Sequence, residues 1–261
     1  GLRYDNQYHF FNQQLGLSPV PRQRELIDPA SRGDHNNFGP RLGFAWDVNG
    51  DGRGDIVVGA PRTSSLGAVT GRVYVLSGRD GAVLWTRDGP SPGIAFGTGV
   101  SGLGDLDGDG IPEQGVGARN AGSSGGGLPY VLAGRDGRIL RTLHPSGTAV
   151  DFGWFFVHDA GDQDADGVPD MYVGDFNDSQ KTPASAGTGR GYVFSGRTGK
   201  RIRTLNAEAV GDGFGVGRGI PDVNGDGYAD LILAAYSSSA GMDHSRDKLP
   251  TAIFGGEALG V

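Results

Sequence analysis

Residues 47–55 read DVNGDGRGD, a run with oxygen-bearing side chains at positions 1, 3 and 5, glycine at position 6 and a carboxylate at position 9. The pattern returns as DLDGDGIPE at 105–113, DQDADGVPD at 162–170 and DVNGDGYAD at 222–230. The starts of the four runs are 58, 57 and 60 residues apart. A fixed period of this length indicates a repeat architecture, in which every repeat is one supersecondary unit.

Short apolar segments typical of β-strands keep step with each acidic run. In the first repeat they are IVVG at 56–59, RVYVLSG at 72–78 and VLWTR at 83–87. The last two are joined by RDGA at 79–82, whose Asp-Gly pair suits a hairpin turn. A further strand fits between the Phe-Gly pair at 38–39 and the acidic run, so each repeat predicts four short antiparallel strands. The equivalent segments are QGVG at 114–117, PYVLAG at 129–134, ILRTL at 139–143, MYVG at 171–174, GYVFSG at 191–196, IRTL at 202–205, LILA at 231–234 and TAIFGG at 251–256.

Repeated four-stranded units of this kind are typical of propeller blades, because one such sheet cannot bury its faces without a neighbour. We therefore predict an all-β fold, namely a β-propeller of four four-stranded blades. The Phe-Gly pairs place the starts of these blades near residues 38, 96, 152 and 214.

The two ends of the chain bear on how the ring closes. The last repeat ends soon after its third strand, and residues 24–28 resemble the fourth strand that it lacks. An N-terminal strand that completes the last blade would remove two exposed sheet edges. We expect an N-terminal extension over 1–23 and a propeller over 24–261. The alternative is that the chain is a piece of a larger propeller.

The composition fits this fold and excludes several other classes. Glycine occurs 50 times in the 261 residues, which suits many tight turns. There is no cysteine, so neither a disulfide framework nor a thiolate metal site is available. The formal net charge of −7 argues against nucleic acid as a partner. No apolar run approaches the roughly 18 residues that indicate a transmembrane helix, so we predict no transmembrane segment.

The acidic runs carry the oxygen donors that a calcium ion prefers. Ca²⁺ takes six to eight oxygen ligands at roughly 2.3–2.6 Å, and the spacing resembles the start of an EF-hand loop. Alternate positions turn their side chains toward one centre, and the carboxylate at position 9 closes the cage. Position 7 offers a backbone carbonyl, so its side chain is free to vary. These predicted carbonyl ligands belong to Arg53, Ile111, Val168 and Tyr228. We predict up to four Ca²⁺ ions, one per blade.

A catalytic interpretation of the same carboxylates is less favourable. The paired carboxylates of glycosidases stand roughly 5–9 Å apart in a cleft. Here they crowd within one tight loop, where their repulsion calls for a cation. In the second loop Glu113 replaces aspartate at position 9, and we expect altered geometry or weaker affinity there.

The first run also contains an Arg-Gly-Asp tripeptide at 53–55. Because Asp55 is the predicted ninth ligand, we do not expect this tripeptide to be free for an adhesion receptor. A second copy at 32–34 lies in a predicted loop, where coincidence in a sequence rich in these residues is the simpler explanation.

Taken together, these motifs resemble the FG-GAP repeat of integrin α-subunit propellers and of many secreted bacterial proteins. The resemblance rests on the Phe-Gly pairs, the acidic runs, VVGAP at 57–61 and GRVYVLSG at 71–78, and it covers 38–261. It implies calcium in the acidic loop of a blade, on one rim of the disc. FG-GAP propellers usually have seven blades, so both an unusually small ring and a fragment of a seven-bladed propeller stay open. The ligands that the resemblance implies are Asp47, Asn49, Asp51 and Asp55; Asp105, Asp107, Asp109 and Glu113; Asp162, Asp164, Asp166 and Asp170; and Asp222, Asn224, Asp226 and Asp230.

The first functional hypothesis is a non-catalytic, calcium-stabilised binding module for a glycan or protein ligand, similar to a lectin or an adhesin. The candidate ligand loops follow the second strand of each repeat, at 60–71, 118–128, 175–190 and 235–250, and the last contains Tyr236. Calcium loops of extracellular modules bind at roughly 10⁻⁴–10⁻³ M, which predicts an extracellular, periplasmic or cell-surface location.

Two further hypotheses stay open. The chain could be the propeller domain of a polysaccharide-active enzyme, a lyase or hydrolase, in which case basic or aromatic side chains of several blades should meet in the central channel. It could also be a purely structural assembly module. No known catalytic signature is present, so we predict no catalytic residues. The histidines, none of which repeats at a shared blade position, are His9, His35, His144, His158 and His244.

Overall fold

The computed structural model describes residues 41–44, 47–64, 69–121, 126–145, 149–178, 187–207, 210–235 and 251–254. Several expectations fall outside these residues. They concern the closing strand at 24–28, the Phe-Gly pair at 38–39, the tripeptide at 32–34 and Tyr236.

The described residues form four antiparallel sheets in which neighbouring strands follow one another along the chain. Three sheets have four strands each and the last has three within the described residues. The first sheet contains β1 (Arg41–Phe44), β2 (Ile56–Ala60), β3 (Arg72–Leu76) and β4 (Val83–Asp88); the second, β5 (Phe96–Gly102), β6 (Gln114–Ala118), β7 (Leu128–Leu132) and β8 (Ile139–Thr142); the third, β9 (Val157–Gly161), β10 (Asp170–Asp175), β11 (Arg190–Phe194) and β12 (Arg201–Asn206); the fourth, β13 (Phe214–Ile220), β14 (Asp230–Ala235) and β15 (Thr251–Phe254). The predicted all-β fold of repeated antiparallel blades is confirmed.

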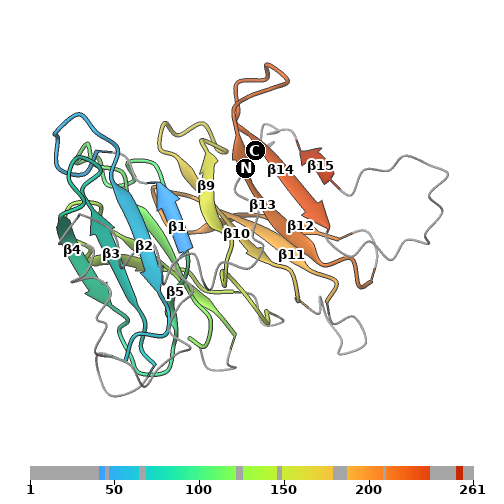
Figure 1. Cartoon of the computed structure of the whole chain (residues 1–261). Coiled ribbons are helices and arrows are strands. Elements are labelled where there is room, and N and C mark those ends of the chain that lie inside the picture. Colours follow the sequence, from blue (N-terminus) through green and yellow to red (C-terminus); the bar gives the residue numbers. More distant parts are fainter. Residues whose placement is uncertain are drawn as a thin grey trace, which may run out of the picture.

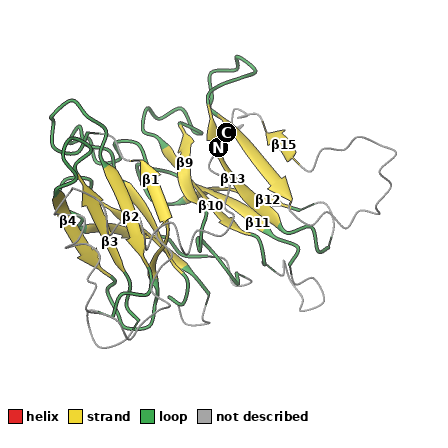
Figure 2. Ribbon diagram, in the orientation of Figure 1, coloured by secondary structure: helices red, strands yellow, loops and turns green. Residues whose placement is uncertain are grey.

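Successive sheets pack side by side through their first strands. Strand β5 contacts β1 and β2 of the preceding sheet, and β13 contacts β9 and β10 in the same way. Figure 1 shows the first sheet at the left, the last at the right and β9 and β10 between them. The connecting loops gather at the two ends of the strands (Figure 2). This is the relation between neighbouring blades of a propeller.

Each hydrophobic core lies between two consecutive sheets. The first joins Val57 and Val75 of the first sheet to Val116 and Leu132 of the second, with Phe96 fully buried between them. A second core joins the second and third sheets, and a third joins the third and fourth. Within the described part of the chain, a sheet therefore buries its apolar faces against its neighbours, which is why the sequence repeats as a whole unit.

The glycines of the Phe-Gly pairs let these sheets approach closely. Gly97 has a φ of +88°, a conformation that glycine adopts without strain. Gly59 of β2 lies so close to the backbone of Gly97 that a Cβ atom on Gly59 would sit less than 3.0 Å from the Gly97 carbonyl oxygen. The same relation holds between Gly117 and Gly153 and between Gly174 and Gly215. The recurring glycines are thus required by backbone contacts between blades.

No helix among the described residues is long and apolar enough to cross a membrane.

Candidate metal centres

Every acidic loop connects the first strand of a sheet to the second. The carboxylate at position 1 organises the turn by accepting the backbone N–H of the position-6 glycine. These N···O distances are 2.5 Å from Gly52 to Asp47 and 2.9 Å from Gly227 to Asp222. The pKa of Asp222 is lowered, and the largest cause is the hydrogen bond from the backbone N–H of Gly227. The position-6 glycines have φ angles of +79°, +83°, +81° and +91° at Gly52, Gly110, Gly167 and Gly227. Glycine adopts these positive φ angles without strain, which explains why all four loops carry glycine at position 6.

The position-9 carboxylates are fully buried at 0% exposure, and in the first three sheets each ties its loop to the rest of the blade. One oxygen accepts the backbone N–H of loop position 2, for example from Gln163 to Asp170 at 2.7 Å. In the third sheet the other oxygen accepts the N–H of Gly196, in the hairpin turn after β11, at 2.9 Å. The equivalent pairs of bonds are made by Asp55 with Val48 and Gly78, and by Glu113 with Leu106 and Gly134; Asp230 accepts from Val223.

Sequence reasoning missed this bracing role. A sequence signal for this contact was available. In the first three repeats a small residue and a glycine follow the third strand, in the motifs YVLSG, YVLAG and YVFSG. In the second loop the longer Glu113 makes the weaker bond, at 3.5 Å from Gly134 N. The bracing bond of this loop is therefore longer than those of the first and third, and altered calcium geometry or affinity at Glu113 stays a prediction.

Burial disfavours the charged form of two of the position-9 acids, Glu113 and Asp170. It raises the pKa of Glu113 to about 7 and the pKa of Asp170 to about 7. Neighbouring carboxylates add to the shift, among them Asp107 for Glu113 and Asp164 for Asp170. A buried anion surrounded by like charges favours either a proton or a bound cation.

Two loops bring carboxylates together at the spacing of a metal site. One oxygen each from Asp105, Asp107 and Glu113 lies within 4.8 Å of the others, and Asp162, Asp164 and Asp170 form an equivalent group. These are positions 1, 3 and 9 of the second and third loops. In the first and fourth loops, position 3 is the amide Asn49 or Asn224.

The third loop also holds an acceptor without a donor. The Oδ1 atom of Asp164 is buried and has no hydrogen-bond partner. Burial, followed by repulsion from Asp166, raises the pKa of Asp164. A buried oxygen of this kind is costly unless a proton or cation satisfies it. The donor set, made only of carboxylates and carbonyls, fits a hard cation such as Ca²⁺.

The position-5 carboxylates have a second set of partners. Asp109 pairs with the Nε of Arg135 at 3.1 Å, and Asp166 pairs with the Nε of Arg197 at 2.8 Å. Both arginines begin the turn between the third and fourth strands, so they approach the acidic loop from the same end of the sheet. Sequence reasoning missed them, although Arg79, Arg135 and Arg197 open the turn in three repeats. Metal coordination by the side chains at positions 1, 3, 5 and 9 and by the position-7 carbonyls stays a prediction.

Asp55 bears on the adhesion hypothesis. It is buried at 0% exposure and accepts N–H groups from Val48 and Gly78. The tripeptide at 53–55 therefore does not present a free carboxylate, as expected from the sequence.

The opposite ends of the sheets carry the predicted ligand loops, of which the structure describes a part. In the third sheet, Trp154 stacks on Phe155 with ring centroids 4.5 Å apart, and Phe176 lies near both rings. The guanidinium of Arg119, from the second sheet, lies 3.9 Å from the Trp154 ring centroid. These aromatic faces already pack on one another and on a cation, so they serve first as contacts between the two blades.

Two of the five histidines lie in the described part of the chain. His144 is exposed after β8, and His158 is half-buried on β9. Burial, with a smaller effect of Arg218 on β13, lowers the pKa of His158 to about 4. The meeting of basic side chains from several blades that the enzyme hypothesis requires stays untested.

The FG-GAP repeat family matches residues 38–76, which span the first acidic run and the strands β2 and β3. The chain contains an FG-GAP repeat. Human integrin alpha-IIb is 38% identical to it over 151 residues, covering 51% of this chain and 14% of the integrin. Bovine phosphatidylinositol-glycan-specific phospholipase D is 32% identical over 198 residues, covering 65% of this chain and 22% of the phospholipase. The chain thus spans less than a quarter of the length of either FG-GAP relative.

A similar arrangement of strands occurs in a solved structure of Bacillus licheniformis rhamnogalacturonan lyase PL11. It has a TM-score of 0.44 and 17% identity, with 73% of this chain and 38% of the lyase covered. A similarity of this size says nothing about what the FG-GAP chain does.

Proposed function

We propose that this chain is a calcium-stabilised propeller module that works outside the cell and binds a glycan or protein ligand without transforming it. The observation that carries the proposal is the convergence of position-1, -3 and -9 carboxylate oxygens within 4.8 Å in two repeats. The unpartnered, buried Oδ1 of Asp164 supports it independently.

The proposed calcium ligands are the oxygen-bearing side chains at positions 1, 3, 5 and 9 and the carbonyl at position 7. When bound, the cation would neutralise acids that repel one another and fix the loop between the first two strands. Because position 9 is also hydrogen-bonded to the hairpin turn in the first three sheets, that ordering would reach the third and fourth strands. A chain without cysteine gains a cross-link in this way.

The extracellular location follows from the expected affinity. Calcium modules with few carboxylates and exposed loops bind at roughly 10⁻⁴–10⁻³ M, and such sites fill only where calcium is abundant. Loop position 3 is exposed in the first and fourth repeats, and each of these loops carries an amide there.

Binding is favoured over catalysis because the repeat is a scaffold and not a reactive centre. Its relatives include an integrin chain and a phospholipase, so the repeat by itself defines no reaction. The repeated acids are engaged in backbone hydrogen bonds and arginine pairs, and none of these contacts resembles a general acid or base aimed at a substrate.

Calcium titration of the metal-free protein by isothermal calorimetry, together with metal analysis after dialysis, tests the proposal. We expect up to four ions, with weaker binding of one of them in the Asp164→Asn variant, which gives the third loop the position-3 amide of the first and fourth loops. Asp80→Asn is the matched control, because Asp80 is an exposed turn residue whose Oδ1 accepts the N–H of Ala82. A folded protein that takes up no calcium at millimolar concentration would contradict the proposal.

A further inference from the structure

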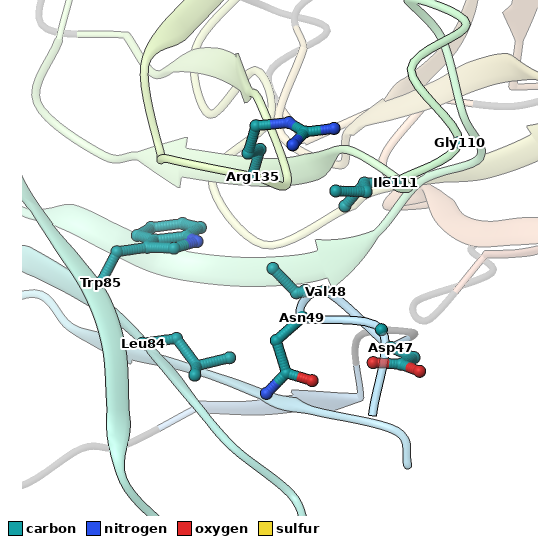
Figure 3. A pocket seen from close by; sticks show the side chains of 9 residues that line it. Asp47, Val48, Asn49, Leu84, Trp85, Gly110, Ile111 and Arg135 are labelled. Carbon is teal, nitrogen blue, oxygen red and sulfur yellow. The ribbon is translucent and has the colours of Figure 1, made fainter. Parts of the chain in front are cut away.

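A cleft of about 510 Å³ opens between the first and second sheets, at the end that carries the acidic loops. Its walls come from the acidic loop of the first sheet, from β4, from the end of the second acidic loop and from the turn after β7 (Figure 3). Binding sites for small molecules typically enclose roughly 300–1,000 Å³. The size therefore suits a short oligosaccharide or a molecule of similar dimensions.

The apolar part of the cleft is built around Trp85. The ring is half-buried, and its Nε1 donates to the carbonyl oxygen of Gly134 at 2.8 Å. The turn of the second sheet fits against the ring, since a Cβ atom on Gly137 would lie 2.7 Å from Trp85 Cε3. Leu84 and Ile111 line the same cavity. The indole is thus held rigidly by the neighbouring blade while it faces the cleft.

The equivalent position in the next sheet shows that the brace does not require an indole. Trp85 is paired with Val75 on β3, and Arg141 is paired with Val131 on β7 in the same register. The guanidinium of Arg141 donates to Gly196 O, and also to Arg197 O at 2.7 Å. Either side chain holds the turn of the following blade. The tryptophan also packs against the first hydrophobic core, and it adds an aromatic surface at the cleft that the bracing of the turn does not require.

Polar groups border the aromatic surface. Arg135 is exposed, with 63% of its side chain accessible, and it uses its Nε to pair with Asp109. A guanidinium has five N–H donors in a fixed plane, so one pairing leaves donors for a ligand. The amide of Asn49 lines the opposite wall and carries N–H donors as well (Figure 3). A sugar ring has an apolar C–H face, which suits stacking on a fixed aromatic ring. It also carries hydroxyl oxygens at its edge, which can accept hydrogen bonds from guanidinium and amide N–H groups.

We propose that this cleft binds a saccharide, which stacks on Trp85 and whose hydroxyl oxygens accept hydrogen bonds from the side-chain N–H groups of Arg135 and Asn49. The inference rests on the proposed function, which gives the module a glycan or protein ligand, and it selects the glycan. A bound cation in the first loop would hold the Asp47 and Asn49 wall in place, so binding weakens when calcium is removed.

The test starts with an array of neutral and uronate-containing oligosaccharides, probed with the folded protein in calcium. The tightest oligosaccharide is then titrated calorimetrically into wild type and variants. Trp85→Arg places at this position the side chain that braces the next pair of blades, so the protein should stay folded, with a lower melting temperature because the indole also packs against the first core. We expect its affinity to fall at least tenfold. Arg135→Gln should weaken binding severalfold, and Arg141→Ala, which removes the equivalent brace away from the cleft, should leave affinity unchanged.

The outcomes separate this site from the proposed function. The saccharide site is overturned if no oligosaccharide binds, or if Trp85→Arg binds the selected oligosaccharide as well as wild type. Calcium binding without saccharide binding would overturn the cleft alone and leave the calcium-stabilised module standing, with a protein ligand. Absence of calcium binding would overturn the proposed function whatever the array shows.

Discussion

At the scale of single residues, the acids of one loop divide into two kinds. Asp170 accepts two backbone N–H groups, at 2.7 and 2.9 Å, from different segments of the chain. Asp164 keeps a buried oxygen without any donor. The first supports the blade with or without metal, whereas the second is satisfied only by a cation or a proton. Both residues are aspartates in the repeated run, so their different roles can be distinguished only in the folded structure.

This division predicts that the stabilities of variants at the two positions depend differently on calcium. Asp170→Asn should destabilise the protein by about 1–3 kcal/mol both in calcium and in EDTA, because an amide nitrogen would face a buried N–H donor. Asp164→Asn should be destabilising in calcium but neutral or stabilising in EDTA, where it removes a crowded charge. Urea unfolding of both variants under the two conditions measures this. Equal behaviour of the two variants would contradict the division.

Asp175 supplies a pH-dependent prediction away from the acidic loops. Its buried carboxylate accepts the N–H groups of Val150 and Asp151, and burial raises the pKa of Asp175 from 3.8 to about 6. The folded state then binds the proton more tightly than the unfolded state. Its stabilising contribution is complete below pH 3.8 and is lost as the pH rises through about 6.

The measurement is the free energy of unfolding in EDTA, from pH 3.5 to 7.5, for wild type and Asp175→Asn. The stability of wild type relative to the variant should fall by about 3 kcal/mol across this window and level off above it. The variant is the control for all other titrating groups. A difference that stays constant with pH would show that the pKa of Asp175 is not raised.

At the scale of elements, the close approach of sheets is set by glycine backbones. The partner of each glycine could not be derived, because Gly59 and Gly97 meet only after two separate sheets have formed and docked. The four strands of each of the first three repeats and the three described strands of the last were predictable, since their alternation and turn residues are local. The position-9 brace and the Arg135 and Arg197 pairs were not, since they join segments that the period alone does not bring together.

Gly59→Ala tests this contact. The added methyl group would collide with the backbone of Gly97, so we expect a loss of about 1–3 kcal/mol and a weaker first inter-sheet core. Gly93→Ala is the control, since a Cβ atom there meets nothing within 4 Å, although its φ of +82° adds a backbone cost of up to about 1 kcal/mol. Guanidinium unfolding compares them. A smaller loss at position 59 than at position 93 would contradict the steric explanation.

At the scale of the whole molecule, calcium should act as a ligand of the native state. Each occupied site stabilises the fold by about 2.7 kcal/mol when free calcium is one hundred times its dissociation constant. For a chain of this length, removal of several ions should lower the melting temperature by roughly 10 °C or more. Differential scanning calorimetry in excess calcium and in EDTA, with magnesium as the second cation, measures the effect. An identical melting temperature in all three buffers would show that the loops are held by hydrogen bonds alone.

The placement of every core between two sheets also says how such a chain can evolve. A duplicated repeat brings both the surface that its predecessor needs and a new surface for its successor, so insertion of a whole repeat disturbs a single junction. A deletion of part of a repeat, in contrast, would damage the junctions on both sides. The length of such a chain can therefore change in steps of one blade. The residues inside a blade that lies between two others are constrained by both neighbouring sheets at once.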